Sequence, residues 1–208
     1  MSSSFSVKAS IFNIRESSPK ERDRFLVDTN VWYYLLFPQE LIPPDGIGGY
    51  QLHFYPEFLA KAKKCGATLY FSSISLVELF RLVESTSYRF YVYKNGLDTE
   101  NFSRKDFRYS AENGWQGVLD NYDAIYSNIK DWANHLPRNE HDDLAYLNNL
   151  HDNLTKGYLE LGDQIMIKAM KKSKFISQII TDDGDFATCK DIEVYTANNS
   201  VIKANKKS

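Results

Sequence analysis

Short apolar runs alternate with helical patterns along most of this 208-residue chain, and this alternation constrains the fold more than any other feature. The clearest runs cover residues 25–27, 67–71, 179–181 and 192–195. Their length and their β-branched and aromatic content are typical of buried strands. Strands that alternate with helices form a parallel sheet covered on both faces. The sequence therefore predicts an α/β fold, a three-layer α/β/α sandwich with a central parallel sheet.

The helical patterns between these runs have recognisable ends. A helix over residues 31–37 should stop before Pro38, since proline disfavours helix in the residue before it. A second helix, over residues 55–64, is closed by Gly66, and a third begins near Ser75. A fourth runs from Gly162 to a cluster of lysines, charges that suit a helix C-terminus.

The remaining segments are less regular. Residues 7–14 are either an edge strand or a loosely held arm, and the lysine-containing end of the chain reads as a solvated tail. Residues 85–158 contain several helical patterns, with breaks at residues 95–96 and at Pro137, and no strong strand signal. We therefore expect one domain over residues 1–208, with a helical insertion over about 85–158.

Charge and composition limit the partners. The formal net charge is −2 and the isoelectric point is near 6.1, so a polyanion must be held by a local patch or through bound cations. Only two cysteines occur, no signal-peptide pattern is visible, and no apolar run approaches the roughly 18 residues of a membrane span. We expect a cytoplasmic protein without membrane contact.

Four acidic residues take equivalent places in this reading. Each ends a strand or begins the helix that follows one, and together they are Asp28, Glu78, Asp163 and Asp183. All four should meet at one edge of a parallel sheet, where burial and mutual repulsion would raise their pKa values unless a cation compensates. Carboxylate ligands without clustered histidine or cysteine suit Mg²⁺ or Mn²⁺. Such ions can clamp a phosphate and activate water, which favours phosphodiester hydrolysis.

Each acid also has a simpler interpretation. Asp28 and Asp163 could be helix caps, and Glu78 could interact with the helix dipole. Three acids crowd residues 182–185, where a turn alone would need one.

The acids lie in four short motifs, at residues 27–31, 75–78, 162–163 and 181–186. In residue type, order and spacing, these motifs resemble those of a PIN-domain ribonuclease, the family that includes the VapC toxins. They cover residues 24–83 and 160–197. The resemblance implies a PIN-like fold and a metal-dependent endoribonuclease in which Asp28, Glu78, Asp163 and Asp183 are the catalytic, metal-binding acids. Asp183 matches the family pattern better than Asp182, and Asn30, Thr181 and Asp185 match residues that support the ligands.

Basic and aromatic residues interleave in the first part of the insertion. Residues 81–110 carry six basic and four acidic side chains, whereas residues 111–163 carry three basic and ten acidic ones. Rings that stack on bases, beside cations that meet phosphates, suit single-stranded RNA, although aromatics at helical spacing also form cores. The candidate RNA-binding residues are Arg89, Lys94, Arg104, Lys105 and Arg108.

Other functions and partners remain open at this point. A nuclease-like fold could bind RNA or a protein without cutting, or the metal site could serve a phosphatase with a narrow closed pocket. The pair His141-Asp142 suggests a metal phosphohydrolase only if further histidines lie nearby. The long insertion separates this chain from the compact toxins, so an antitoxin partner and a homodimer are left as open alternatives beside the RNA substrate.

Overall fold

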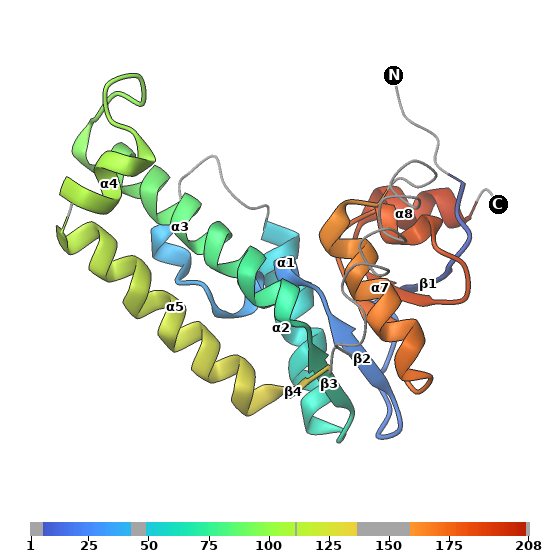
Figure 1. The fold of residues 1–208 in the computed structure, drawn as a ribbon. Helices are drawn as coiled ribbons and strands as arrows, with labels where there is room; N and C mark the ends of the chain where they lie inside the picture. The colour runs from blue at the N-terminus through green and yellow to red at the C-terminus, as the bar shows by residue number, and fades with distance from the viewer. Residues whose placement is uncertain (1–5, 43–48, 111, 137–158, 207–208) are drawn as a thin grey trace, which may run out of the picture.

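The computed structural model describes residues 6–42, 49–110, 112–136 and 159–206, which are built around a six-stranded parallel sheet (Figure 1). The strand order is β1-β6-β5-β2-β3-β4, and every neighbouring pair is parallel. The strands are β1 (Ser10–Asn13), β2 (Arg24–Val27), β3 (Thr68–Phe71), β4 (Asn134–His135), β5 (Gln178–Ile180) and β6 (Glu193–Thr196).

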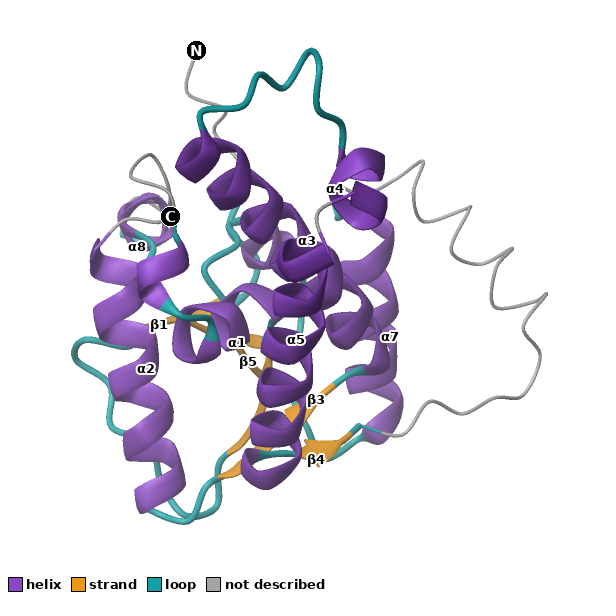
Figure 2. Cartoon of the chain, turned by 90° about the vertical axis from the view of Figure 1, so that its left-hand side faces the viewer, coloured by secondary structure: helices purple, strands orange, loops and turns teal. Residues whose placement is uncertain are grey.

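Helices cover both faces of this sheet. They are α1 (Thr29–Leu36), α2 (Gly49–Lys64), α3 (Ser73–Asn95), α4 (Arg104–Ser110), α5 (Glu112–Trp132), α7 (Leu161–Ser173) and α8 (Asn199–Asn205), with 3-10 turns η1 (Gln39–Leu41) and η2 (Asp185–Thr188). Helices α1, α2, α3 and α5 lie on one side of the sheet and α7 lies on the other (Figure 1). Figure 2 shows the larger helical layer from outside, with the strands behind it.

The alternation of side chains along each strand separates two hydrophobic cores. Phe25 and Val27 of β2 join a core with α1, α2, α3 and α5, whereas Leu26 between them joins a core with α7. On β5, Ile180 joins the first of these cores and Ile179 joins the second. A strand that is apolar on both faces needs cover on both faces, so the predicted α/β fold with helices on each side of a parallel sheet is confirmed.

Most predicted strands and helix ends are confirmed. All four predicted strands are present, and residues 10–13 form the edge strand β1 rather than a loose arm. Helix α1 ends before Pro38, with its C-cap at Phe37, and α3 ends at Gly96 in the left-handed conformation, with φ of 60°. The expected break at Pro137 and the pair His141-Asp142 lie outside the described residues.

Three expectations about the secondary structure are wrong. Strand β4 lies within the predicted helical insertion and consists of two polar residues that pair with Tyr70 and Phe71. Helix α2 begins at Gly49 instead of residue 55 and contains Pro56 in its interior, a residue normally found in the first turn. The expected solvated tail forms α8, which buries Val201 and packs beside β1.

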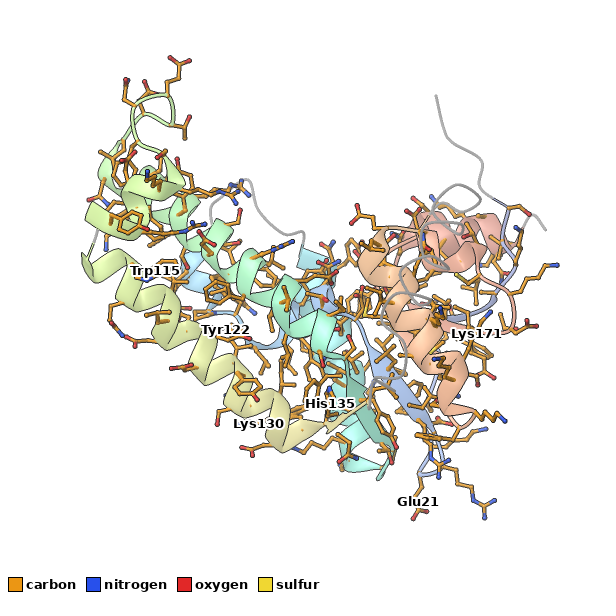
Figure 3. The ribbon with its side chains drawn as sticks, in the orientation of Figure 1. Glu21, Trp115, Tyr122, Lys130, His135 and Lys171 are labelled. Atoms are coloured by element: carbon orange, nitrogen blue, oxygen red, sulfur yellow. The ribbon has the colours of Figure 1, made fainter. Side chains whose placement is uncertain are left out.

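The helical insertion extends the larger layer with a long antiparallel pair. Helices α3 and α5 have 23 and 21 residues and pack against each other. Trp115 and Tyr122 of α5 both meet the ring of Phe80 on α3 edge-on (Figure 3).

Within the described residues, no helix combines the length and apolar content that crossing a membrane requires.

Two glycines of α5 should respond oppositely to substitution by alanine. A Cβ at Gly114 would lie 2.6 Å from the ring of Phe107, whereas a Cβ at Gly117 would have nothing within 4 Å. We expect Gly117→Ala to raise the free energy of unfolding by about 0.5–1 kcal/mol through helix propensity. Gly114→Ala should lower it by about 1 kcal/mol, because overpacking outweighs that gain. Urea unfolding of both variants measures this, and equal effects would contradict the packing described.

Candidate active site

The central strands β2 and β5 place their carboxyl ends side by side where the chain changes direction through the sheet. From β2 the chain continues to β3 on one side, and from β5 it continues to β6 on the other. Val27 pairs with Ile180, so the next residues, Asp28 and Thr181, stand next to each other. Ligands of open α/β sheets bind at such a switch point.

Asp28 is almost completely buried there, with 3% of its surface exposed. One carboxylate oxygen accepts a hydrogen bond from the backbone N–H of Thr29, at 2.7 Å, and caps α1. The other accepts from the hydroxyl of Thr181, also at 2.7 Å. Asp28 is therefore a helix cap, but the cap uses only one of its two oxygens.

Glu78 reaches the same place from α3. Its carboxylate accepts a hydrogen bond from the hydroxyl of Thr29, at 2.7 Å. A Cβ at Gly162 would lie only 2.0 Å from Oε1 of Glu78, so the start of α7 passes directly over this carboxylate. A side chain at position 162 would displace the Glu78 carboxylate from this position.

Asp163 follows that glycine in the first turn of α7, and 9% of its surface is exposed. Burial, followed by the negative charges of Asp28, Asp183 and Glu78 in that order, raises its pKa to about 8. The hydrogen bonds among the described residues include none to its carboxylate. Asp163 thus combines burial, negative neighbours and unused acceptor oxygens.

Asp183 is joined to Asp28 through Thr181. The Thr181 hydroxyl donates to Asp28 and accepts from the backbone N–H of Asp183, at 2.9 Å. Asp183 in turn accepts a hydrogen bond from the backbone N–H of Asp185, at 2.8 Å. Burial, followed by the charge of Asp183, raises the pKa of the Asp185 carboxyl.

The neighbouring acid, Asp182, has a different role. Its carboxylate accepts hydrogen bonds from the Tyr50 hydroxyl, the Gln51 amide and the Tyr55 hydroxyl, at 2.7–3.0 Å. Burial, followed by the charge of Asp182, raises the pKa of Tyr50 to about 12, so this hydroxyl stays a donor. Asp182 therefore fixes the start of α2 to the turn after β5.

Mutual repulsion is the main electrostatic property of the group. Burial, with smaller contributions from the charges of Asp183 and Glu78, raises the pKa of Asp28 from 3.8 to about 7 against the opposing effect of its two hydrogen bonds. Four elements, namely the end of β2, α3, α7 and the turn after β5, thus bring the four predicted acids within electrostatic reach of one another. Either protons or a cation must balance these charges near neutral pH.

The donor set fits a hard divalent cation. The four acids offer only oxygen ligands, and a carboxylate that accepts one hydrogen bond per oxygen keeps further lone pairs. Among the described residues, no group of three or more histidine, cysteine, aspartate or glutamate side chains is arranged so that it could hold a metal ion. The carboxylates would therefore have to move closer together to share one ion. Asp28, Asp163, Asp183 and Glu78 are the residues that would hold Mg²⁺ or Mn²⁺, with Asp163 the acid most in need of a positive partner.

The residues expected to support the acids make different contacts. Thr181 is completely buried and bridges two acids, as a supporting residue should. Asn30 is half-buried, and no hydrogen bond joins it to another described residue. Thr29 instead orients Glu78, a role the sequence analysis missed because a threonine beside an acid gives no signal of which distant side chain it meets.

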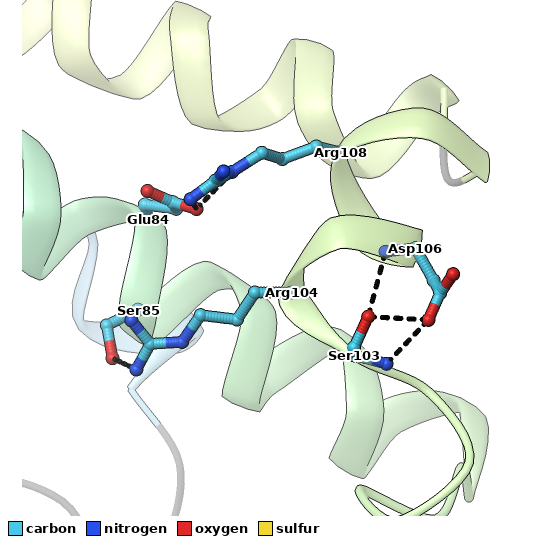
Figure 4. Close-up of polar contacts among 6 residues, drawn as sticks. All are labelled: Glu84, Ser85, Ser103, Arg104, Asp106 and Arg108. Carbon is cyan, nitrogen blue, oxygen red and sulfur yellow. Dashed lines mark hydrogen bonds and ion pairs between the residues drawn. The ribbon is translucent and has the colours of Figure 1, made fainter.

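The candidate RNA-binding residues lie on α3 and α4, and Figure 4 shows the contacts of Arg104 and Arg108 within the protein. The guanidinium of Arg108 contacts the buried carboxylate of Glu84, at 2.6 and 2.7 Å, and Arg104 donates to the hydroxyl of Ser85. Both contacts fasten α4 to α3. All five candidates are exposed residues.

Comparisons with known proteins found no family model, no curated protein and no solved structure that matches this chain.

Removing the charge of Asp163 should change how stability depends on pH. The carboxyl of Asp163 has an ordinary pKa near 4 in the unfolded chain and about 8 in the folded protein. Between about pH 4 and pH 8 the folded state therefore keeps a proton that the unfolded state has lost. Stability should therefore fall as pH rises from about 4 towards 8, and Asp163→Asn should remove this loss. In metal-free buffer we expect the variant to melt several degrees above the parent near pH 8, since about 1 kcal/mol shifts the midpoint by about 2–4 °C in a chain of this size.

Divalent metal supplies the control for this measurement. Added Mg²⁺ or Mn²⁺ should stabilise the parent near pH 8 and should stabilise Asp163→Asn much less. Parallel pH profiles of melting temperature for the two proteins would contradict the assigned environment of Asp163.

Proposed function

We propose that this chain is a Mg²⁺- or Mn²⁺-dependent endoribonuclease of the PIN-domain type. One observation carries the proposal: four acids from separate parts of the sequence converge at the switch point of a parallel sheet, and two of them, Asp28 and Asp163, have strongly raised pKa values. Evolution could place one acid there as a helix cap. Four mutually repelling acids need a compensating positive charge, which a metal ion would supply. A metal ion that binds a phosphate substrate would also explain why the acids are placed together.

The residues of the chain have separate tasks in this proposal. When bound, the metal would polarise the phosphodiester and lower the pKa of a water molecule. Thr181 and the N–H of Thr29 hold the Asp28 carboxylate in one orientation, and the Thr29 hydroxyl holds Glu78. Asp163 must lose its proton before it can bind a cation, so protons and metal compete for this carboxylate below about pH 8.

RNA is the substrate that the surrounding surface favours. The exposed basic residues Arg89 and Lys94 lie on α3, the helix that also carries Glu78. The same helix carries the exposed aromatic side chain of Tyr93. Cations beside aromatic rings suit the backbone and bases of a single strand. The acidic centre itself would repel a polyanion, so binding of the strand near it depends on the metal.

The adjacent acids Asp182 and Asp183 provide a matched pair of variants. We expect Asp183→Asn to lower metal-dependent cleavage of labelled single-stranded RNA by at least about 100-fold, more than the loss of a supporting residue of a metal site. The fold should be intact. Asp182→Asn should keep most of the cleavage activity but lower the free energy of unfolding by about 1–3 kcal/mol, because its carboxylate accepts bonds from Tyr50, Gln51 and Tyr55.

Other results would identify the alternatives. RNA binding without metal-dependent cleavage would replace the nuclease with a binding module. Hydrolysis of small phosphomonoesters without RNA cleavage would indicate a phosphatase. Full cleavage by Asp183→Asn would remove this acid from the site.

A further inference from the structure

A cavity of about 330 Å³ lies in the helical insertion, apart from the four acids. It is a partly open pocket lined by α3, α4, α5 and η1, which contribute among others Ser87, Phe107, Gly117 and Leu41. Ser87 is nine residues beyond Glu78 on α3, or about 14 Å along the helix axis. The volume of the cavity is in the range of small-molecule sites.

Helix α5 contributes Gly117 to the lining of the cavity, at a position where the packing of the helix does not require glycine. A Cβ at Gly117 would meet nothing within 4 Å, although Gly114, one turn earlier, is needed to admit the rings of Phe107 and Tyr91. Glycine in a helix interior is unfavourable. Its presence at position 117 keeps space that a larger residue would fill.

One residue of the lining carries a polar group that lacks a partner. The Ser87 hydroxyl oxygen is buried and makes no hydrogen bond with any described residue. Buried hydroxyl groups normally have a partner, and an unpaired one is costly. A ligand with a hydrogen-bonding edge would satisfy it.

The rest of the lining indicates the kind of ligand. Phe90 and Tyr91 provide partly exposed aromatic surfaces beside the completely buried ring of Phe107, and Asn95 and Asn121 provide amides. Asn95 donates one N–H to the Tyr91 carbonyl and keeps its own carbonyl oxygen as an acceptor. Flat rings together with amides are the groups that recognise a nucleobase by stacking and by its hydrogen-bonding edges.

A cation at the rim completes this set. Lys94 lines the cavity with an exposed side chain and forms no ion pair with the described residues. An ammonium group at the mouth of an aromatic pocket suits the phosphate attached to a bound base.

We propose that this cavity binds a nucleobase that carries a phosphate. The base stacks on the aromatic side chains of α3, its edge meets Ser87 and the amides, and its phosphate meets Lys94. The base comes either from a free nucleotide or from single-stranded RNA, and the second source rests on the proposed nuclease function.

Isothermal titration calorimetry of the full chain with each of the four nucleoside monophosphates, and with a ten-nucleotide single-stranded RNA in EDTA, tests this proposal. We expect at least one of these probes to bind. Gly117→Phe should weaken that binding by about 10- to 100-fold, the effect of losing a stacked base. Lys94→Gln should weaken it and reduce its salt dependence, whereas Lys130→Gln, at the far end of α5, should change neither.

Ser87→Ala is the second variant, because it removes the unpaired hydroxyl without filling the cavity and should fold normally. We expect weaker binding with an unchanged melting temperature. Binding of monophosphates identifies a free-nucleotide site, and binding of RNA alone identifies a substrate subsite. No binding of any probe to the parent, or equal binding by the parent, Gly117→Phe and Ser87→Ala, would overturn the proposal.

The nuclease function is read separately in the same variants. Asp183→Asn should bind the probes like the parent, since the cavity lies away from the acids. Loss of cleavage in Asp183→Asn with unchanged binding would keep both proposals, and binding by a parent that never cleaves RNA would keep only the cavity.

Discussion

The hydroxyl of Thr181 connects the two halves of the candidate site. It donates to Asp28 after β2 and accepts from the N–H of Asp183 after β5, so a single buried group fixes acids that lie 155 residues apart in sequence. This contact exists only because β2 and β5 are neighbours in the parallel sheet. The two hydrophobic cores therefore support the site by holding these strands in register. Glu78 and Asp163 then join from helices packed on opposite faces of the sheet.

Burial of like charges is the constraint that gives this arrangement its chemical meaning. A fold selected only for stability would avoid acids whose pKa values rise to about 7 and 8. The neighbouring Asp182 shows the contrast, because three hydrogen bonds from α2 give it a clear structural role. The four converging acids lack such a complete set of donors, and the proposed metal would supply the missing positive charge.

The sequence predicted the parts of this protein that depend on local patterns. Apolar runs predicted the four main strands, and acids near the ends of strands predicted the candidate site. Strand β4 was not predicted, because its two polar residues form a strand only by pairing with the edge of β3. The start of α2 was placed too late, because Pro56 is unusual inside a helix. The roles of Thr29 and Asp182 depend on which side chains the tertiary fold brings near them. The family resemblance and the nuclease activity stay predictions.

Anomalous diffraction from crystals soaked in Mn²⁺ near pH 8.5 tests the central claim most directly, because it locates the metal without relying on activity. We predict a manganese peak bounded by the carboxylates of Asp28, Asp163 and Asp183, with Glu78 binding the ion directly or through water. A map with no peak among these acids, or with manganese bound only elsewhere on the protein, would contradict the account.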